Sequence, residues 1–411
     1  MQAVKEENQE ISEVKNGSVV TPKGFRAAGA HAGLRYSKND IGVIFSDIPA
    51  NSAAVYTTNR FQAAPITVTK DSLEKEQKLQ AIFVNSACAN ACTGKRGLAD
   101  AYQTRSWVAE KFNIPEHFIA VSSTGVIGEY LQMDKIQKGI SLLDPKATSE
   151  SSEEFAKAIL TTDLVTKRSC FKTVIDGKEV VVGGVAKGSG MIEPNMATML
   201  AFVTTDANIS SEHLHTALKE VTNHTFNQIT VDGDTSTNDT VVVMANGLAN
   251  NAPLSPSHPE WKKFIALLQS VCANLAKKIA RDGEGATKLI EVQVLGATND
   301  EEARAIAKTI VGSNLVKTAV FGADANWGRV ICAVGYSNAK IDPEKIDIAV
   351  GPYPIMIHSE VVPYSEKEVT DYLKSELTKF TVNLNIGEGH GMAWGCDLTY
   401  DYVKINASYR T

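Results

Sequence analysis

The stretch KGSGMIEPNMATML, residues 187–200, decides how the rest of the sequence is interpreted. It begins as a glycine-rich loop and enters an apolar run, Met199 to Val203, that is typical of a buried strand. The dipeptide Ala197-Thr198 lies at the join. A threonine that opens a core strand has its position fixed by the strand ladder, and a small residue before it leaves the intervening carbonyl open to attack. Two interpretations of Thr198 follow from this stretch: it is either a structural residue of the strand or a nucleophile.

The hydroxyl of Thr198 predicts an N-terminal nucleophile that is produced by self-cleavage. Its Oγ would attack the carbonyl carbon of Ala197, and water would then release a new N-terminus at Thr198. The freed α-amine has an ordinary pKa of about 7.7–8.0, which suits a general base near neutral pH. The loop before the join supplies groups able to polarise or hydrogen-bond, namely Lys187, Ser189 and Asn195. The alternative is that Thr198 is a structural residue, because threonine is common in strands.

Cleavage at this join would divide the chain into an N-terminal fragment, 1–197, and a C-terminal fragment, 198–411. We expect both fragments to share one core, because Thr198 opens an apolar strand and no linker rich in Pro, Gly or Ser separates the halves. The first residues are polar and predict a loose tail to about residue 15.

The composition is that of an ordinary globular protein. Of the 411 residues, 43% are hydrophobic and 21% are charged, which is enough for a sizeable core. The net charge of −6 argues against a nucleic-acid partner. No stretch approaches roughly 18 apolar residues and no secretory signal is visible, so we expect a cytoplasmic protein without a membrane partner. Cys88 and Cys92 have neither a second cysteine pair nor a nearby His-x3-His, so we expect no metal site.

Short strands and amphipathic helices are mixed along the chain, and this pattern predicts an α+β fold with layered sheets. The segment CFKTVIDGKEVVVGGVA, 170–186, predicts a hairpin that turns at Asp176-Gly177. The polar segment DGDTSTND, 232–239, does not fit a calcium loop, and turn chemistry or the shaping of an active site both remain open. Near the C-terminus we expect further strands at 317–322, 328–337 and 396–408.

Several segments together resemble the ornithine acetyltransferase family of arginine biosynthesis, and they follow one another in the family's order. The stretch at 187–200 resembles the self-cleavage motif of that family, and the resemblance extends from about residue 20 to the last residue. At Ala87 and Cys88 the chain departs from the family pattern, where we expect glycine and asparagine. The other segments that carry the resemblance are GFRAAGAHAGL (24–34), VNSACANACTG (84–94), VSSTGVIG (121–128), LTTD (160–163), TVDGDTSTNDT (230–240), DGEGATKLIE (282–291), GADANWGRV (322–330) and AWGCDLTYDYVKINASYRT (393–411).

The resemblance implies a fold, a reaction and an assembly. The fold would be the layered αββα-type sandwich of the self-processing aminopeptidase/ornithine acetyltransferase superfamily. The reaction would move an acetyl group from N-acetylornithine to glutamate through an acetylated threonine, with acetyl-CoA as a second donor in some members and no cofactor. The two fragments would stay together, with two copies of each in a heterotetramer.

The resemblance also implies roles for individual residues of this chain. Thr198 would be the nucleophile, with its own α-amine as the base, and the cut would fall between Ala197 and Thr198. Thr124 and Gly125 would form the oxyanion hole, which suits a hydroxyl and an N–H at a strand end. Besides Thr198, the substrate-binding residues would be Thr161, Lys187, Glu284, Asn406 and Thr411, with the choice between Thr161 and Thr162 left open.

Two other classes of function compete with an acyltransferase. A self-processing amidase or aminopeptidase would use the same nucleophile and oxyanion hole but would pass the acyl group to water. A non-enzymatic binding or scaffold protein would need neither cleavage nor turnover.

Overall fold

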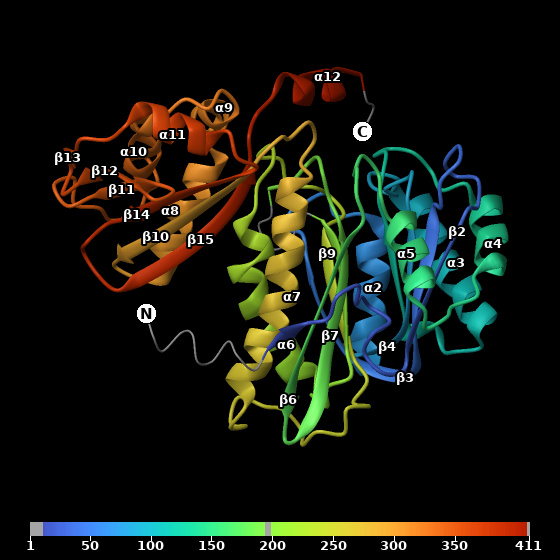
Figure 1. Ribbon diagram of the computed structural model, residues 1–411. Coiled ribbons are helices and arrows are strands. Elements are labelled where there is room, and N and C mark those ends of the chain that lie inside the picture. Colours follow the sequence, from blue (N-terminus) through green and yellow to red (C-terminus); the bar gives the residue numbers. More distant parts are fainter. Residues whose placement is uncertain (1–10, 194–198, 409–411) are drawn as a thin grey trace.

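A computed structural model describes residues 11–193 and 199–408, which form two β-sheets with helices packed against them (Figure 1). The first sheet has the strand order β1-β6-β7-β8-β9-β3-β4-β5, with β2 beside β3, and the second has the order β13-β12-β11-β14-β10-β15. The strands of the first sheet are β1 (Ser12–Glu13), β2 (Phe25–Ala30), β3 (Ile41–Tyr56), β4 (Lys78–Asn85), β5 (Ile119–Ser123), β6 (Lys167–Ile175), β7 (Lys178–Lys187), β8 (Leu200–Thr205) and β9 (Thr240–Ala245). Those of the second sheet are β10 (Leu289–Ala297), β11 (Asp347–Val350), β12 (Tyr353–Ile357), β13 (Glu360–Val361), β14 (Leu377–Asn383) and β15 (Gly389–Cys396).

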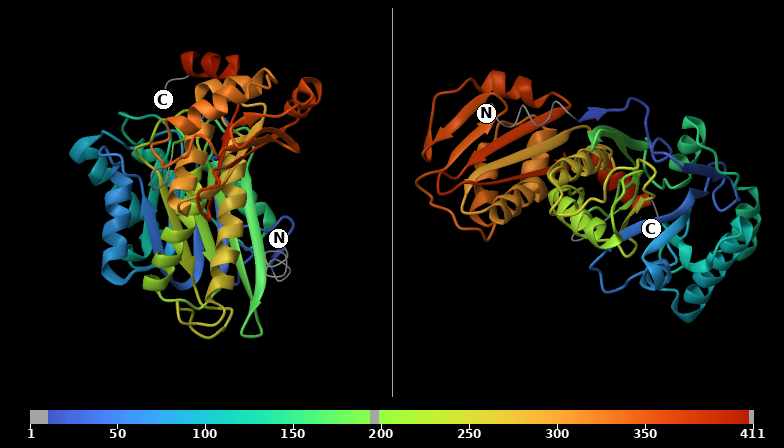
Figure 2. Two further views of the ribbon diagram at one scale, coloured as in Figure 1. Left: turned by 90° about the vertical axis from the view of Figure 1, so that its left-hand side faces the viewer. Right: turned by 90° about the horizontal axis from the view of Figure 1, so that it is seen from below.

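Most helices lie on the outer faces of these sheets, whereas α5 (Ser149–Ala158) packs into the space between the two strand layers of the first sheet (Figures 1 and 2). The other helices are α2 (Ala64–Glu76), α3 (Gly94–Phe112), α4 (Met133–Leu142), α6 (Ser211–His224), α7 (Trp261–Arg281), α8 (Asp300–Gly312), α9 (Asn314–Phe321), α10 (Trp327–Gly335), α11 (Glu366–Leu373) and α12 (Tyr400–Ser408), with the short 3-10 turns η2 (Glu116–Phe118) and η3 (Phe226–Gln228).

The first sheet folds into two layers at the long strand β3. The first part of β3 pairs with β2 and β4, whereas its last part, Asn51–Tyr56, pairs with β9. The pairing register with β4 shifts between Phe45 and Ala50, and this irregularity lets the strand bend. One strand therefore belongs to both layers.

Three apolar clusters fill the spaces between the layers, and they define a four-layer sandwich. One cluster joins α6 and α7 to β6–β9, a second lies between the two layers of strands, and a third joins β2–β5 to α2, α3 and α4. In the middle cluster the ring of Phe202 on β8 meets that of Phe155 on α5 edge to face, with ring centroids 5.9 Å apart. The prediction of an α+β fold with an αββα sandwich is confirmed.

Strand β8 lies in the interior of the first sheet. All six of its residues are buried, and it pairs antiparallel with β7 on one side and parallel with β9 on the other. The predicted hairpin before it is also present, because β6 and β7 pair around Asp176 and Gly177, which have φ angles of 49° and 69°. The strand that follows the Ala197-Thr198 join is thus held between neighbours from both sides of that join.

The second sheet, which the sequence did not identify as a separate unit, has its own apolar cluster with α8–α11. It is tied to the sandwich through α7 by the carboxylate of Glu291. This group accepts a hydrogen bond from Trp394 Nε1 at 2.9 Å and forms ion pairs with Lys277 and Lys379, also at 2.9 Å.

The predicted strands at 317–322 and 328–337 are wrong, because both segments are helical, in α9 and α10. Short apolar runs fit either type of element, and here the buried positions of α10, Val330, Ala333 and Val334, have helical spacing. Ser313 also caps α9 by accepting a hydrogen bond from the N–H of Val316 at 3.4 Å.

The predicted strand at 396–408 is wrong beyond its first residue. Strand β15 ends at Cys396, and α12 covers Tyr400–Ser408. The hydroxyl oxygen of Thr399 accepts from the N–H groups of Asp401 and Tyr402 at 3.2 and 3.4 Å, which is the arrangement of a helix N-cap. The alternation of aromatic and polar residues was therefore misleading.

The expectation that the chain is a loose tail to about residue 15 is wrong for residues 12 and 13. Ser12 and Glu13 form β1 and pair with Lys172 and Phe171 of β6, because the edge of that strand offers free backbone groups. Over the ranges that the structure describes, no helix combines the length and apolar character needed to span a bilayer.

Candidate active site

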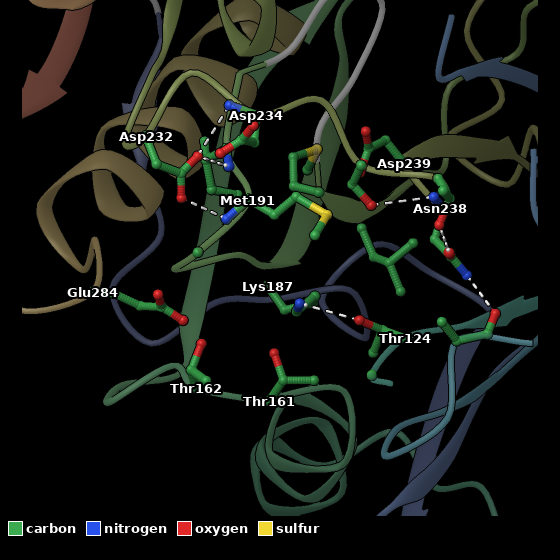
Figure 3. Close-up of a pocket in the computed structure, with 18 of the residues that line it drawn as sticks. Thr124, Thr161, Thr162, Lys187, Met191, Asp232, Asp234, Asn238, Asp239 and Glu284 are labelled. Carbon is green, nitrogen blue, oxygen red and sulfur yellow. Dashed lines mark hydrogen bonds between the residues drawn. The ribbon is translucent and has the colours of Figure 1, made fainter. Parts of the chain in front are cut away.

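A cavity of about 220 Å³ lies where the ends of β5 and β7 meet the starts of β8 and β9 (Figure 3). These strand ends come together because β3 bends, so that Asn85 of β4 pairs with one end of β3 and Thr240 of β9 with the other. Side chains from the α7–β10 loop and from α12 complete the wall. The lining residues include Thr124, Gly125, Thr161, Thr162, Lys187, Gly190, Met191, Met199, Leu200, Asp232, Asp234, Asn238, Asp239, Glu284, Tyr402 and Asn406.

Lys187 and Thr124 form a buried pair in this cavity. Lys187 Nζ, at the end of β7, donates a hydrogen bond to Thr124 Oγ1 at 3.2 Å (Figure 3). An ammonium group can only donate, so the hydroxyl proton of Thr124 remains available for another acceptor. Burial lowers the pKa of Lys187 from its ordinary value, against the opposing effect of nearby carboxylates such as Asp163.

The loop that carries Thr124 is held from two directions. Ser123 Oγ donates to Asn85 Oδ1 at 2.6 Å, and Asn238 Nδ2 donates to the carbonyls of Ser123 and Ala89 at 2.8 and 2.6 Å. Gly125 has a φ of 130°, and a Cβ there would lie 2.2 Å from the carbonyl carbon of Ala87. A side chain at position 125 would therefore displace the loop.

Glu284 forms the opposite wall and is almost fully buried. Its Oε2 accepts a hydrogen bond from Asn406 Nδ2 of α12 at 2.8 Å, and its backbone N–H donates to the carbonyl of Ser189 at 3.0 Å. A Cβ at Gly190 would lie 2.4 Å from the Glu284 carboxyl, so the glycine-rich loop approaches this carboxylate at a distance that only glycine permits.

The chain just before the Ala197-Thr198 join is fixed by Asp232. Its two carboxylate oxygens accept from the N–H groups of Met191 and Ile192 at 2.6 and 2.8 Å. Beyond the join, the carbonyl of Met199 accepts from the N–H of Thr240 at 2.9 Å. The described chain is thus hydrogen-bonded on both sides of the predicted cleavage site.

Asp239 places a buried carboxyl group on the cavity wall. Burial raises its pKa well above the ordinary value, although hydrogen bonds from Ser236 and the charge of Lys187 oppose this effect. Within the described part of the chain, its Oδ2 has no hydrogen-bond partner. Burial therefore favours the neutral, protonated form of this carboxyl group.

The structure brings together most of the residues that the sequence predicted. Thr124, Gly125, Lys187, Glu284 and Asn406 line one cavity, although Asn406 comes from a helix and not from the expected strand. Thr161 and Thr162 both line it, so the choice between them stays open. Ala197, Thr198 and Thr411 lie outside the described residues.

Sequence reasoning did not single out Asp232, Asn238 or Asp239. All three belong to DGDTSTND, the segment whose density of polar residues before a buried strand was the available signal. Within residues 11–193 and 199–408, no group of three or more His, Cys, Asp or Glu side chains is arranged to hold a metal ion.

Comparison with known proteins gives a match over almost the whole chain. Residues 26–411 match the model of the ArgJ family. The chain is 64% identical over 411 residues to the arginine biosynthesis bifunctional protein ArgJ of Geobacillus kaustophilus, covering 100% of both proteins. It is 61% identical to the ArgJ protein of Halalkalibacterium halodurans, covering 98% of this chain and 99% of the relative.

Two crystal structures also resemble parts of this chain. The ArgJ protein of Bacillus halodurans matches at 57% identity with a TM-score of 0.45, covering 46% of this chain and 98% of that one. The ornithine acetyltransferase of Mycobacterium tuberculosis, complexed with ornithine, matches at 36% identity with a TM-score of 0.43, covering 46% of this chain and 100% of that one.

Proposed function

The chain belongs to the ArgJ family, and we propose that it transfers an acetyl group from N-acetylornithine to glutamate. The products would be ornithine and N-acetylglutamate. The family match over residues 26–411 supports an enzyme of arginine biosynthesis. The observation that carries the specific reaction is the cavity next to Met199, in which a hydroxyl, a buried ammonium and a buried carboxylate converge.

The first half-reaction would acetylate Thr198. Its α-amine would take the proton from Oγ while Oγ attacks the acetyl carbon of N-acetylornithine. The resulting alkoxide would accept hydrogen bonds from the Thr124 hydroxyl and the Gly125 N–H. The C–N bond would then break, and the proton held by the α-amine would pass to the leaving nitrogen of ornithine.

Lys187 supports this assignment of the oxyanion hole. By donating to Thr124 Oγ1 at 3.2 Å, it directs the hydroxyl proton of Thr124 away from the lysine and leaves it for the alkoxide. Its positive charge also favours the developing negative charge, and because Lys187 and Thr124 are both buried, this attraction is screened less than it would be in water.

In the second half-reaction, the neutral amine of glutamate would attack the acetyl ester of Thr198 and pass one proton to the free α-amine. The alkoxide would form in the same oxyanion hole, and the Thr198 Oγ would leave and take that proton from the α-amine. Glu284 suits recognition of the side-chain ammonium of ornithine, because it is a nearly buried carboxylate with one neutral hydrogen-bond donor, Asn406. Thr161 or Thr162, Lys187 and Thr411 would contribute the other substrate contacts.

The nucleophile would arise from autocatalytic cleavage between Ala197 and Thr198. The N-terminal fragment 1–197 and the C-terminal fragment 198–411 would remain associated, because β7 and β8 pair in the interior of one sheet. We further propose that two copies of each fragment assemble and that acetyl-CoA serves as a second acetyl donor.

Denaturing gel electrophoresis of the purified protein tests the processing step. We expect two bands, of 197 and 214 residues, and N-terminal sequencing of the larger fragment should begin Thr-Met-Leu-Ala. Thr198→Ala should leave one intact chain without transferase activity, whereas Thr198→Ser should retain part of both cleavage and turnover. Active wild-type protein that migrates only as the 44.2 kDa chain would contradict the mechanism.

An acetate assay separates the transferase from an amidase that uses the same nucleophile. Wild-type enzyme should form N-acetylglutamate from N-acetylornithine and release little free acetate while glutamate is present. Equal rates of acetate release with and without glutamate would show that water is the acceptor and would overturn the proposal. Replacing N-acetylornithine by acetyl-CoA in the same assay tests the second donor.

A further inference from the structure

A fully buried carboxylate, Asp163, lies directly behind the cavity wall without lining the cavity itself. Its Oδ2 accepts a hydrogen bond from the N–H of Thr161 at 3.0 Å. Its Oδ1 accepts from the N–H of Gly188 at 2.7 Å and from Lys167 Nζ, also at 2.7 Å. One side chain thus joins the Thr161 loop to the end of β7, where Lys187 enters the cavity.

The ammonium of Lys167 neutralises this carboxylate. Lys167 is fully buried and bridges Asp163 to Asp282, whose Oδ2 lies 2.6 Å from Nζ. Burial alone would raise the pKa of Asp163, but Lys167, Lys187 and the donated hydrogen bonds outweigh burial and hold the pKa well below the ordinary value. Asp163 is therefore an anion with three donors satisfied, and the proposed function gives it no role.

We propose that Asp163 is a positioning residue, which sets the spacing between Thr161 and Lys187 and so determines how tightly the cavity binds its amino-acid substrates. This inference rests on the proposed function, because it assumes that Thr161 or its neighbour Thr162 and Lys187 face the substrate. The physical reason is that Thr161 lies in a loop and Lys187 is the last residue of β7, so side-chain contacts such as those of Asp163 help to set where the two residues lie in the cavity.

An amide cannot replace the carboxylate in this arrangement. The three groups around Asp163 all donate, whereas asparagine offers one acceptor oxygen and a second group that also donates. In Asp163→Asn the amide nitrogen would therefore face either the N–H of Thr161 or the N–H of Gly188 together with Lys167 Nζ, and in both cases donors would face each other. One of the two segments would have to move.

Asp282 provides a matched control because it is the other carboxylate of Lys167. It contacts the N–H groups of Leu164 and Val165, at 3.1 and 3.4 Å, and neither of these residues lines the cavity. Asp282→Asn removes the same charge from Lys167 but leaves the hydrogen bonds to Thr161 and Gly188 intact. The two variants should therefore lose similar stability, because each leaves the buried lysine with one carboxylate.

The test compares kcat, KM and thermal unfolding for wild type, Asp163→Asn and Asp282→Asn, with N-acetylornithine as donor and glutamate as acceptor. We expect kcat/KM to fall about 10- to 100-fold in Asp163→Asn, mainly through KM, and less than about threefold in Asp282→Asn, because only the first change displaces groups at the substrate. Similar kinetic losses in both variants would overturn the inference and leave Asp163 a general support of the fold. Inactive wild-type enzyme would instead contradict the proposed function.

A triple variant keeps the test decisive if Asp163→Asn folds poorly. Asp163→Asn/Lys167→Met/Asp282→Asn removes the buried cation together with both of its carboxylates, so the unfolding temperature should recover relative to Asp163→Asn. The carboxylate that holds Thr161 and Gly188 is still missing, and the rise in KM should persist. A KM that returns to the wild-type value would show that charge balance, and not positioning, is what Asp163 provides.

Discussion

The two walls of the cavity differ in how the fold supports them. The wall at the strand ends, with Thr124 and Lys187, is buried in the sandwich and backed by Asn238 and Asp163. The wall on the other side ends in α12, none of whose residues is buried; it lies over the ends of the strands near the C-terminus (Figure 1). Side chains on the first wall have fixed partners, whereas α12 reaches Glu284 through the side chain of Asn406.

This difference suggests separate roles for the two walls, one in stabilising the transition state and one in binding the substrate. Stabilising a charge that exists only in the transition state requires donors that are already oriented, and the strand-end wall supplies them. Holding a flexible amino-acid side chain requires a charge of the right sign but less rigid geometry. We therefore expect the loss of an oxyanion donor from the strand-end wall to lower kcat, and changes toward α12 to raise KM.

The largest effect is expected for Thr124→Val, which removes the hydroxyl and keeps the shape of the side chain. Loss of one oxyanion donor should reduce kcat about 10²- to 10³-fold with little change in KM. The measurement is the initial rate of acetyl transfer at saturating N-acetylornithine and glutamate.

The matched control is Thr124→Ser, which retains the hydroxyl and its hydrogen bond from Lys187. This variant should keep most of the activity. If Thr124→Val turns over at nearly the wild-type rate, the strand-end wall does not provide the catalytic donor, and the distinction between the walls disappears.

A smaller effect is expected for Glu284→Gln, which removes the charge and preserves an oxygen that can accept from Asn406. A hydrogen bond to a charged group contributes about 1.5–3 kcal/mol, so KM for N-acetylornithine should rise roughly 10- to 100-fold. The acetylated enzyme formed from acetyl-CoA needs no ornithine site, and its formation gives the control rate. A loss confined to kcat would assign Glu284 to catalysis and not to binding.

Asn406→Ala should have a smaller effect again. It removes one neutral donor from the Glu284 carboxylate, worth about 1 kcal/mol, so KM for N-acetylornithine should rise roughly fivefold. Proteolysis of residues 400–408 should become faster in the same variant, because the contact helps to hold α12. An effect on KM as large as that of Glu284→Gln would mean that α12 contributes as much to substrate binding as the Glu284 carboxylate that it contacts.

The sequence predicted the strand-end wall better than it predicted α12. Glycine-rich and polar loops next to buried strands mark the positions of Thr124 and Lys187, and both line the cavity. The segment 400–408 was misread because aromatic and polar residues alternate there, and only the cap at Thr399 reveals the helix. Local pattern cannot reveal which side an exposed helix covers, since none of its residues is buried.

The supporting residues were the hardest to predict. Asp163 directly follows Thr161 and Thr162, which the sequence predicted as substrate-binding candidates, but Asp163 itself was not predicted. Its contacts with Lys167, Gly188 and Thr161 form only when the folded chain brings these segments together. A buried charge has no signature in the sequence beyond its residue type. Its function comes from contacts between segments that are far apart in the chain.

The smallest effect is expected at Ala87, where the strand-end wall contains a strained position. Ala87 has a φ of 79°, a conformation that favours glycine, and the family resemblance led us to expect glycine there. Ala87→Gly should relieve about 1–2 kcal/mol of steric strain, while the greater freedom of glycine in the unfolded chain cancels about 0.4–1 kcal/mol. The net result is a slightly higher midpoint of urea unfolding.

Ala91→Gly in the same loop, at a buried residue without a positive φ, should lower the midpoint instead. If both changes destabilise the protein equally, Ala87 is held by packing that outweighs its backbone strain, and the strand-end wall is even more firmly supported than its hydrogen bonds imply.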